Sequence, residues 1–299
     1  MKRITYRVDA EEGWRVDYLM KKKFMVGSGM IASLKRVENG ITLNGLSVHT
    51  DVRLKKGDEL SFSIEDTGGH NPAPPVDIPL NIVYEDDYLV VVDKPAGIAV
   101  QGPPEIGDRT IAGAFSFLWG QEKPFHPVSR LDRGTSGLFA VAKSGYIHDR
   151  LRRQLHTDMC VRKYLALVEG TPRPPAANID LAIARENENS LKRIISDSGK
   201  PSKTTYKTIL SANGFSLLEV VLSTGRTHQI RVHLAAIGHP LAGDFLYGRE
   251  DRSLIARPAL HSYYLSFCHP ISGRTLEFTS PIPSDIFKLL PPETKNYLK

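Results

Sequence analysis

Hydrophobic and polar residues follow short periodic patterns over the first part of the chain, and these patterns predict a small module at residues 1–66. Apolar residues recur at helical spacing in two blocks, and apolar and polar residues alternate in three others. Asn44-Gly45, between two of the alternating blocks, supplies the positive backbone angles of a tight hairpin turn. The expected helices cover 16–20 and 31–37, and the expected strands cover 41–43, 46–48 and 60–64.

The next stretch, residues 67–80, is rich in proline and glycine and contains little that can pack, so we interpret it as a linker. We assign residues 81–299 to a second domain. Its strand and helix patterns mix without a repeat or a regular alternation, which favours an α+β domain over a doubly wound parallel sheet. Expected strands lie at 82–84, 89–93, 161–168 and 215–222, and expected helices follow an apolar stripe at 147–155 and begin near Thr227.

Composition places the chain among ordinary folded proteins with a modest basic excess. Its 299 residues include 39 Lys and Arg against 33 Asp and Glu, a net charge of +6, which favours polyanionic partners only weakly. Cys160 and Cys268 have no CxxC partner, so neither a disulfide framework nor a zinc site is expected. The start of the chain lacks the apolar run of a signal peptide, and no stretch approaches the ~20 apolar residues of a membrane span. We therefore expect a cytoplasmic protein without a membrane partner.

The most informative stretch is 126–143, HPVSRLDRGTSGLFAVAK, a polar loop that enters an apolar strand. Asp132 lies there between Arg130 and Arg133, cations that favour the charged form of a carboxylate. The following Thr135-Ser136-Gly137 can stabilise a tight turn through side-chain hydrogen bonds to the backbone. Most Arg-Asp-Arg runs are solvated turns, so these residues alone favour a surface loop over a catalytic one.

Together with other motifs, this stretch resembles the RluA-type (large) family of RNA pseudouridine synthases. Residues 130–138 are similar to the RLDxxTSGL signature of that family, although Ser129 stands where the family usually has histidine. The similarity continues in order along nearly the whole chain, at 82–87 with 91–97, 162–168, 225–234 with 238–244, and 260–261 with 269–270. It implies a pseudouridine synthase fold, α+β with a mixed, mainly antiparallel sheet flanked by helices. Residues 1–66 are similar to the small α-L-type RNA-binding domain that precedes it in many members.

The resemblance also implies a reaction, the isomerisation of uridine to pseudouridine in structured ribosomal or transfer RNA without a cofactor. An ionised aspartate can attack or deprotonate near the sugar, which makes Asp132 the candidate for the bond rearrangement. The target base must flip out of its stack, and the ring of Tyr164 is expected to stack on it; without the motif, Tyr164 reads as a core aromatic. The family's catalytic arginine matches Arg231. Its apolar neighbours indicate a buried guanidinium that needs a carboxylate partner, for which we expect Asp132.

A group of basic residues is expected to contact RNA. Arg130 is a candidate to fill the gap left by the flipped base or to bind phosphate, and Arg226, at a strand-to-helix turn, to bind phosphate. The densest basic cluster lies on and beside the expected helix at 147–155, and it is either an RNA-backbone surface or a solvated helix face. The full set of candidates is Arg130, Arg133, Arg150, Arg152, Arg153, Lys163 and Arg226.

Metal chemistry is not expected, because His228 and His233 are five residues apart rather than the four that place two imidazoles on one helical face. A phosphate-handling hydrolase would need a metal cluster or a phosphate loop, and the sequence has neither motif. The main alternative is a catalytically silent RNA-binding assembly or folding factor on the same scaffold. Such a protein can lose the aspartate, the tyrosine or the arginine, whereas this chain retains all three. Neither interpretation implies a protein partner.

Overall fold

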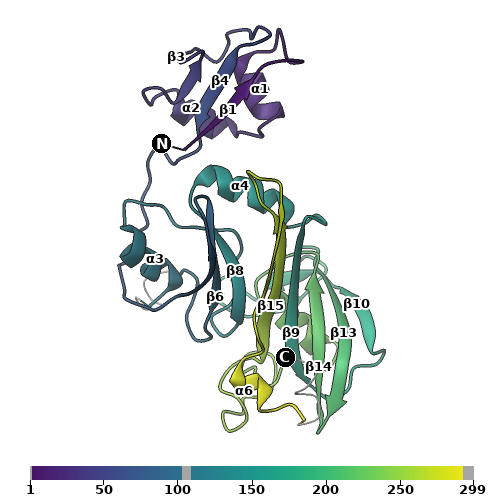
Figure 1. The fold of residues 1–299 in the computed structure, drawn as a ribbon. Helices are drawn as coiled ribbons and strands as arrows, with labels where there is room; N and C mark the ends of the chain where they lie inside the picture. The colour runs from purple at the N-terminus through teal and green to yellow at the C-terminus, as the bar shows by residue number, and fades with distance from the viewer. Residues whose placement is uncertain (1, 103–108, 292–299) are drawn as a thin grey trace.

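The computed structural model describes residues 2–102 and 109–291, which form a small N-terminal module and a larger sheet domain (Figure 1). The module is an antiparallel sheet in the order β1-β4-β2-β3 with two helices. Its elements are β1 (Arg3–Arg7), α1 (Val16–Lys22), α2 (Ser28–Leu34), β2 (Ile41–Leu43), β3 (Leu46–Ser47) and β4 (Glu59–Ser63). Both expected helices and the expected hairpin are confirmed, with Asn44 and Gly45 at positive φ. Strand β1 was not expected as an element.

The larger domain is built on one mixed sheet in the order β10-β13-β14-β9-β15-β8-β6-β5, with β16 beside β15 and β7 beside β8. Its strands are β5 (Asn81–Glu85), β6 (Leu89–Lys94), β7 (His126–Pro127), β8 (Ser136–Ala142), β9 (Cys160–Glu169), β10 (Ala176–Asp180), β13 (Lys203–Ala212), β14 (Phe215–Leu222), β15 (Leu260–Cys268) and β16 (Thr275–Thr279). The pairing of β15 with β8 is parallel and the other pairings described are antiparallel, as expected.

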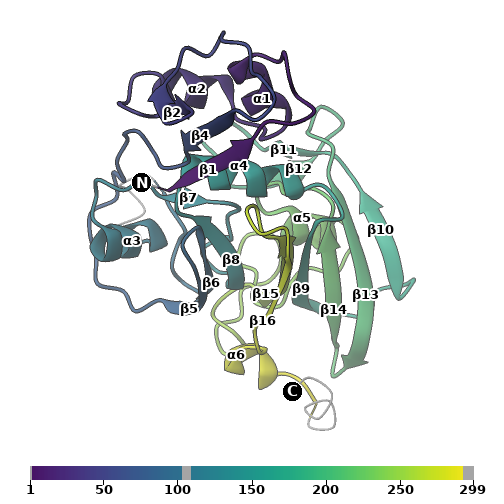
Figure 2. The ribbon, with the colours of Figure 1, turned by 45° about the horizontal axis from the view of Figure 1, so that its top comes forward.

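Helices and a small hairpin complete the domain and can be followed in Figure 2. They are α3 (Ile111–Trp119), α4 (Gly145–Gln154), α5 (Gln229–Ala236) and α6 (Ser284–Phe287), with the paired strands β11 (Ile183–Arg185) and β12 (Arg193–Ile195). Alternation along β9 sends Tyr164 and Ala166 into a core shared with α5, and Leu165 and Leu167 into a core shared with α6. Both faces of the central sheet are therefore buried, which explains the long apolar runs of its strands.

Gly137 permits the single parallel pairing at the centre of the sheet. Its φ is +109°, and a Cβ placed there would lie 2.2 Å from the carbonyl oxygen of Ser262. Any side chain would force β8 and β15 apart at the position where Gly137 pairs with Ser262. The glycine of the TSG turn is thus fixed by the close approach of two strands.

The N-terminal module packs directly on α4. The Tyr146 hydroxyl donates to the carbonyl of Phe24 at 3.1 Å, and its ring lies edge-on to Phe62, with 6.4 Å between ring centroids. Asp66 accepts the backbone N–H of Gly145 at 2.8 Å, at the first turn of α4. One hydrophobic cluster continues from the module across α4 into β6 and β8. Helix α4 is therefore held between the module and the sheet.

Residues 67–80 contain no helix or strand, but they are not a loose tether. Asn71 is buried and donates its side-chain N–H to the carbonyl of Ala112 at 2.8 Å, and the Ser116 hydroxyl donates to the carbonyl of Ala73 at 2.7 Å. Ile78 is also buried. Most of residues 67–80 are exposed, as expected of a linker, but hydrogen bonds at Asn71 and Ala73 hold the stretch to α3.

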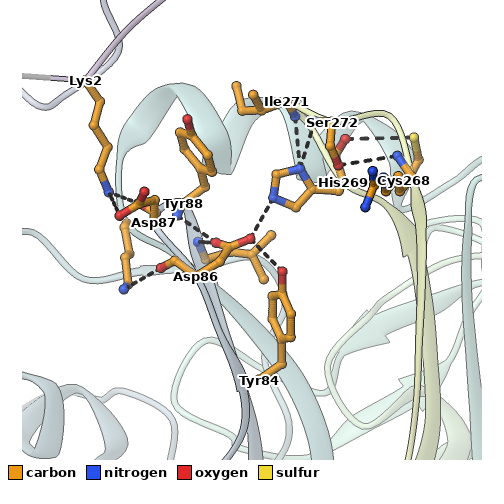
Figure 3. Close-up of polar contacts among 12 residues, drawn as sticks. Lys2, Tyr84, Asp86, Asp87, Tyr88, Cys268, His269, Ile271 and Ser272 are labelled. Carbon is orange, nitrogen blue, oxygen red and sulfur yellow. Dashed lines mark hydrogen bonds and ion pairs between the residues drawn. The ribbon is translucent and has the colours of Figure 1, made fainter.

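A polar cluster ties the β5–β6 turn to the β15–β16 turn (Figure 3). Asp86 accepts the Tyr84 hydroxyl at 2.8 Å and lies 2.9 Å from Nε2 of His269, and it also accepts backbone N–H groups of its own turn. Burial raises the pKa of Asp86, but these hydrogen bonds outweigh it and hold the pKa below its ordinary value. Lys2 of the module reaches the same turn, where its Nζ lies 3.2 Å from Asp87 Oδ1.

Candidate active site

The sheet register brings the Asp132 loop close to Tyr164. Ser262 of β15 pairs with Gly137 of β8 on one side and with Tyr164 of β9 on the other. Asp132 lies in the turn that leads into β8, closed by the Thr135 N–H donating to the Asp132 carbonyl at 3.0 Å. Its side chain is 26% exposed, so the carboxylate is open to a ligand. Two of the three expected catalytic residues therefore sit on adjacent parts of one scaffold.

Arg231 reaches the same place from α5, but its main partner is Asp244. The guanidinium donates from Nε and Nη2 to the two oxygens of Asp244, both at 2.7 Å, while its Nη1 lies 3.8 Å from Asp132 Oδ2. The expectation of an Arg231–Asp132 ion pair is confirmed, and the expectation that this pair compensates the buried charge is wrong. Asp244, which is fully buried, performs that task and leaves Nη1 facing Asp132.

Two aromatic rings and a histidine complete the surroundings of Arg231. Its guanidinium carbon lies 5.1 Å from the ring centroid of Tyr247 and 5.7 Å from that of Phe245. The Tyr247 hydroxyl is 3.0 Å from Nδ1 of His228, the residue at positive φ that precedes α5. Burial lowers the pKa of His228, and the negative charge of Asp132 opposes this. A neutral imidazole therefore stands near the carboxylate at neutral pH.

Tyr164 is buried in the core shared with α5, to which Leu131 of the Asp132 loop also belongs. Burial raises the pKa of its hydroxyl; the positive charge of Arg162 opposes this, and the negative charge of Asp132 adds to it. The phenol thus keeps its proton at neutral pH. It can offer an aromatic face and a neutral hydrogen-bonding hydroxyl, but not a phenolate base.

Lys94 supports the Asp132 loop from below. Its side chain is fully buried at the end of β6, and Nζ donates to the carbonyls of Pro95 and Ile98 at 2.8 Å and of Arg133 at 3.3 Å. Burial and the charge of Arg257 lower the pKa of Lys94 to about 7, while the charge of Asp132 raises it. The ammonium form has one N–H for each carbonyl, so a positive charge can be held behind the catalytic loop.

The basic residues flanking Asp132 have different surroundings. Arg130 is exposed, which leaves it free to meet a nucleic acid. Arg133 is exposed as well, but its Nε donates to the carbonyl of Gly97 at 2.9 Å while its own carbonyl accepts the Gly97 N–H at 2.8 Å. Arg133 therefore clamps the Asp132 loop to the loop after β6.

The other expected RNA-binding residues are spread over the molecule. Arg152 and Arg153 are exposed on the last turn of α4, where Arg153 pairs with Asp149 at 2.8 Å; Arg150, one turn earlier, is half-buried. Arg226 is exposed in the loop before α5.

Lys163 differs from the other candidates, because it projects from the face of β9 opposite Tyr164. Its Nζ lies 3.5 Å from Glu219 Oε2. Arg130 and Arg133 flank Asp132 in the chain and remain beside it in the structure. Lys163 lies on the other face of β9 from Tyr164, away from this group.

Two buried histidines, His233 and His261, serve the fold. His233 binds the Thr204 hydroxyl and the carbonyl of Leu181, both at 2.9 Å, and His261 lies 3.0 Å from the Ser136 hydroxyl. Among the residues described, no group of three or more His, Cys, Asp or Glu side chains is placed to hold a metal ion. The chemistry available at the site is that of a carboxylate next to a buried arginine, above a protonated tyrosine.

Sequence reasoning missed Asp244, Lys94 and His228. Asp244 closes a motif that was recognised, and the rule that a buried guanidinium needs a carboxylate would have found it had the nearest acidic residue after α5 been considered. Lys94 ends β6, two residues after the apolar run 89–92, and nothing in the sequence shows that it is buried or which carbonyls it meets. The left-handed backbone of His228 has no sequence signal, since histidine at positive φ is uncommon.

Comparisons with known proteins agree on one family. Residues 88–236 match the family model described as RNA pseudouridylate synthase. An uncharacterised RNA pseudouridine synthase of Mycobacterium bovis is 36% identical over 93% of this chain and 94% of its own length. The ribosomal large subunit pseudouridine synthase D of Zymomonas mobilis is 40% identical over 74% of this chain and 76% of its own. The solved human RNA pseudouridylate synthase domain containing 1 covers 68% of this chain and 83% of its own, with a TM-score of 0.56 at 27% identity.

Proposed function

Because this chain belongs to the RNA pseudouridine synthase family and isomerises uridine in RNA to pseudouridine, we propose that Asp132, Tyr164 and Arg231 carry out that reaction on a ribosomal or transfer RNA. The observation that supports the site assignment most strongly is the Asp132–Arg231–Asp244 arrangement. In it the partly exposed carboxylate of Asp132 lies beside Nη1 of Arg231, and the buried carboxylate of Asp244 holds the other two nitrogens of the same guanidinium.

Asp132 is the group that acts on the nucleotide. The reaction breaks the bond from the sugar to N1 of uracil and forms a bond from the same sugar carbon to C5, and a carboxylate can attack or deprotonate to begin it. Arg231 faces Asp132 with Nη1 at 3.8 Å from Oδ2 and orients its carboxylate. The bidentate bonds to Asp244 prevent Arg231 from collapsing onto Asp132, so one oxygen stays available to the substrate.

Tyr164 forms the floor on which the flipped uracil stacks. Its ring is buried and its position is set by pairing on both sides of β9. With its proton retained, the hydroxyl contributes a hydrogen bond rather than a full negative charge when the C5 proton leaves. The flipped base leaves a gap in the RNA, and exposed Arg130, two residues before Asp132, is placed to enter it.

Ribosomal or transfer RNA is proposed as the substrate because relatives of similar length include enzymes named for the ribosomal large subunit. The net charge of +6 suits a polyanion, and the N-terminal module is proposed as an α-L-type RNA-binding domain that adds contacts outside the catalytic domain. No helix in the described part of the chain has the length and apolar character needed to cross a bilayer. We place the protein in the cytoplasm, where these RNAs are found, and propose that it works without cofactor or protein partner.

Mapping pseudouridines in total RNA from cells with and without this gene tests the proposal. We expect one or a few sites to disappear from ribosomal or transfer RNA and to return when the wild-type gene is restored, but not when it carries Asp132→Asn. Loss of sites only from messenger RNA would overturn the substrate assignment. Restoration of ribosome assembly or RNA folding by Asp132→Asn, without restored pseudouridine, would instead favour the silent RNA-binding factor.

A further inference from the structure

Arg162 differs from the other buried arginines of the structure. Arg231 and Arg257 are each held by a bidentate carboxylate, Asp244 and Asp285 respectively. Arg162 is as buried as these, with 6% of its surface exposed, yet no carboxylate among the residues described lies within ion-pair distance of it. Leaving a guanidinium buried without an opposite charge is costly, so its retention here needs an explanation.

The donors of Arg162 are only partly used. Nη2 donates to the carbonyl of Leu155, at the end of α4, at 3.2 Å, whereas Nε is buried and has no hydrogen-bond partner. Nη1 lies 3.6 Å from the point where a Cβ on Gly225 would stand. Gly225 is exposed, so this edge of the guanidinium approaches the surface beside a residue without a side chain. No side chain at position 225 therefore covers Nη1.

This position adjoins the active site. Arg162 lies two residues before Tyr164 on the same face of β9, and its charge opposes the rise in the pKa of Tyr164. Arg162 and Ser129 line one cavity of about 10 Å³, which links Arg162 to the loop that carries Asp132. Arg162 thus lies between Leu155 at the end of α4 and Gly225 in the loop before α5, next to Ser129 of the loop that carries Asp132.

We propose that Arg162 binds a backbone phosphate of the RNA strand next to the target uridine, through Nη1 over Gly225. A planar guanidinium with free donors matches phosphate, and the phosphodiester supplies the negative charge that the protein does not. The proposal deepens the proposed function and rests on it. Arg162 is a positioning residue in this account: it anchors the strand so that the flipped base meets Tyr164 and Asp132.

Neutral linkages in the RNA test the contact directly. In a short stem-loop with the mapped target uridine, each phosphate within a few nucleotides of that uridine is replaced in turn by an uncharged methylphosphonate. Binding and single-turnover pseudouridine formation are measured separately. Wild-type protein is expected to lose about tenfold to a hundredfold in affinity at one linkage, the range of a charged hydrogen bond. Arg162→Gln should be insensitive to that linkage, while Arg274→Gln, which removes an exposed charge in the turn between β15 and β16, should keep the wild-type pattern.

A second variant covers the case in which Arg162→Gln does not fold, as judged by its thermal transition. Gly225→Leu places a side chain over Nη1 without altering Arg162, and it should abolish sensitivity to the same linkage. The proposal would be overturned if Arg162→Gln still lost affinity at the same methylphosphonate linkage as the wild type. If only Gly225→Leu folds, the same result in that variant would overturn it. If wild-type protein binds the RNA with this linkage pattern but forms no pseudouridine, the proposed function fails and the phosphate contact stands.

Discussion

Replacing Asp244 with asparagine is expected to destabilise the protein strongly and to slow catalysis. The substitution leaves the buried Arg231 without its bidentate partner, and Asp132 at 3.8 Å from Nη1 is too exposed to replace it. Removing one member of a buried pair costs about 3–5 kcal/mol, because the remaining charge stays buried without compensation. At roughly 2–4 °C per kcal/mol for a protein of this size, the melting temperature should fall by about 6–20 °C.

The chain contains a matched control in Arg257 and Asp285. This pair has the same bidentate geometry, with Nε–Oδ2 at 2.6 Å and Nη2–Oδ1 at 2.8 Å. The Asp285 side chain is 45% exposed, however, whereas that of Asp244 is fully buried. Water can reach the position of the Asp285 carboxylate and partly compensate the Arg257 charge, so Asp285→Asn should cost less than Asp244→Asn even though the Arg257 side chain is itself only 9% exposed. The two substitutions therefore separate burial from hydrogen-bond geometry.

Urea unfolding, followed by the fluorescence of Trp14 and Trp119, gives the free energy of unfolding for each variant. Single-turnover measurements at saturating enzyme give the rate of the chemical step. We expect Asp244→Asn to lower both quantities and Asp285→Asn to leave the rate near the wild-type value. Equal destabilisation by the two variants, or a cost below 1 kcal/mol for Asp244→Asn, would refute the argument that burial of the Arg231–Asp244 pair sets its importance.

Three further expectations follow from the structure. Burial lowers the pKa of Lys94 from 10.5 to about 7, so between these pH values the unfolded chain holds more protons at this position and stability rises with pH. Urea unfolding from pH 7 to 9 should show a shallower rise in Lys94→Met than in wild type, by about 1 kcal/mol per pH unit; identical slopes would contradict the shift. Arg231→Lys should depress the single-turnover rate, because lysine cannot hold Asp244 at two points. Arg226→Lys should mainly weaken salt-dependent RNA binding. A larger fall in the single-turnover rate for Arg226→Lys than for Arg231→Lys would show that the two arginines are wrongly assigned. Deleting residues 1–66 should weaken RNA binding, measured by titration, and leave the active site assembled. It should also lower the melting temperature, because it exposes the face of α4 around Tyr146. Loss of a cooperative thermal transition would place the domain boundary elsewhere.

Local patterns predicted the elements whose neighbours in sequence are also their neighbours in space. The Asn44-Gly45 hairpin, the helix at α4 and the strand 215–222 depend on turn chemistry and periodicity, and all three are confirmed. Strand β1 was missed because its partner β4 is distant in the chain. The contacts of residues 67–80 with α3 were not expected, because hydrogen bonds rather than apolar side chains make them.

For the site, the sequence named the residues but not their pairing. Asp132, Tyr164 and Arg231 lie in a turn, a strand and a helix. The register of β15 between β8 and β9 brings the Asp132 loop to Tyr164, and the 3.8 Å contact with Asp132 brings Arg231 to the same place. Arg231 donates to Asp244 at 2.7 Å and lies 3.8 Å from Asp132. The spacing of these residues in the sequence does not predict which carboxylate is the closer partner. The same holds for Arg162, whose unpaired donor is a property of its surroundings.

The central claim is that Asp132 carries out the isomerisation, and the most direct test is pseudouridine formation by Asp132→Asn on the mapped substrate RNA. Asparagine keeps the size of the side chain and removes the ionised oxygen, so the variant should fold, bind RNA with near wild-type affinity and form no measurable pseudouridine. Losing the group that begins the bond rearrangement should raise the barrier by several kcal/mol, at about 1.4 kcal/mol for each tenfold in rate. Turnover by Asp132→Asn within tenfold of the wild-type rate would contradict the account.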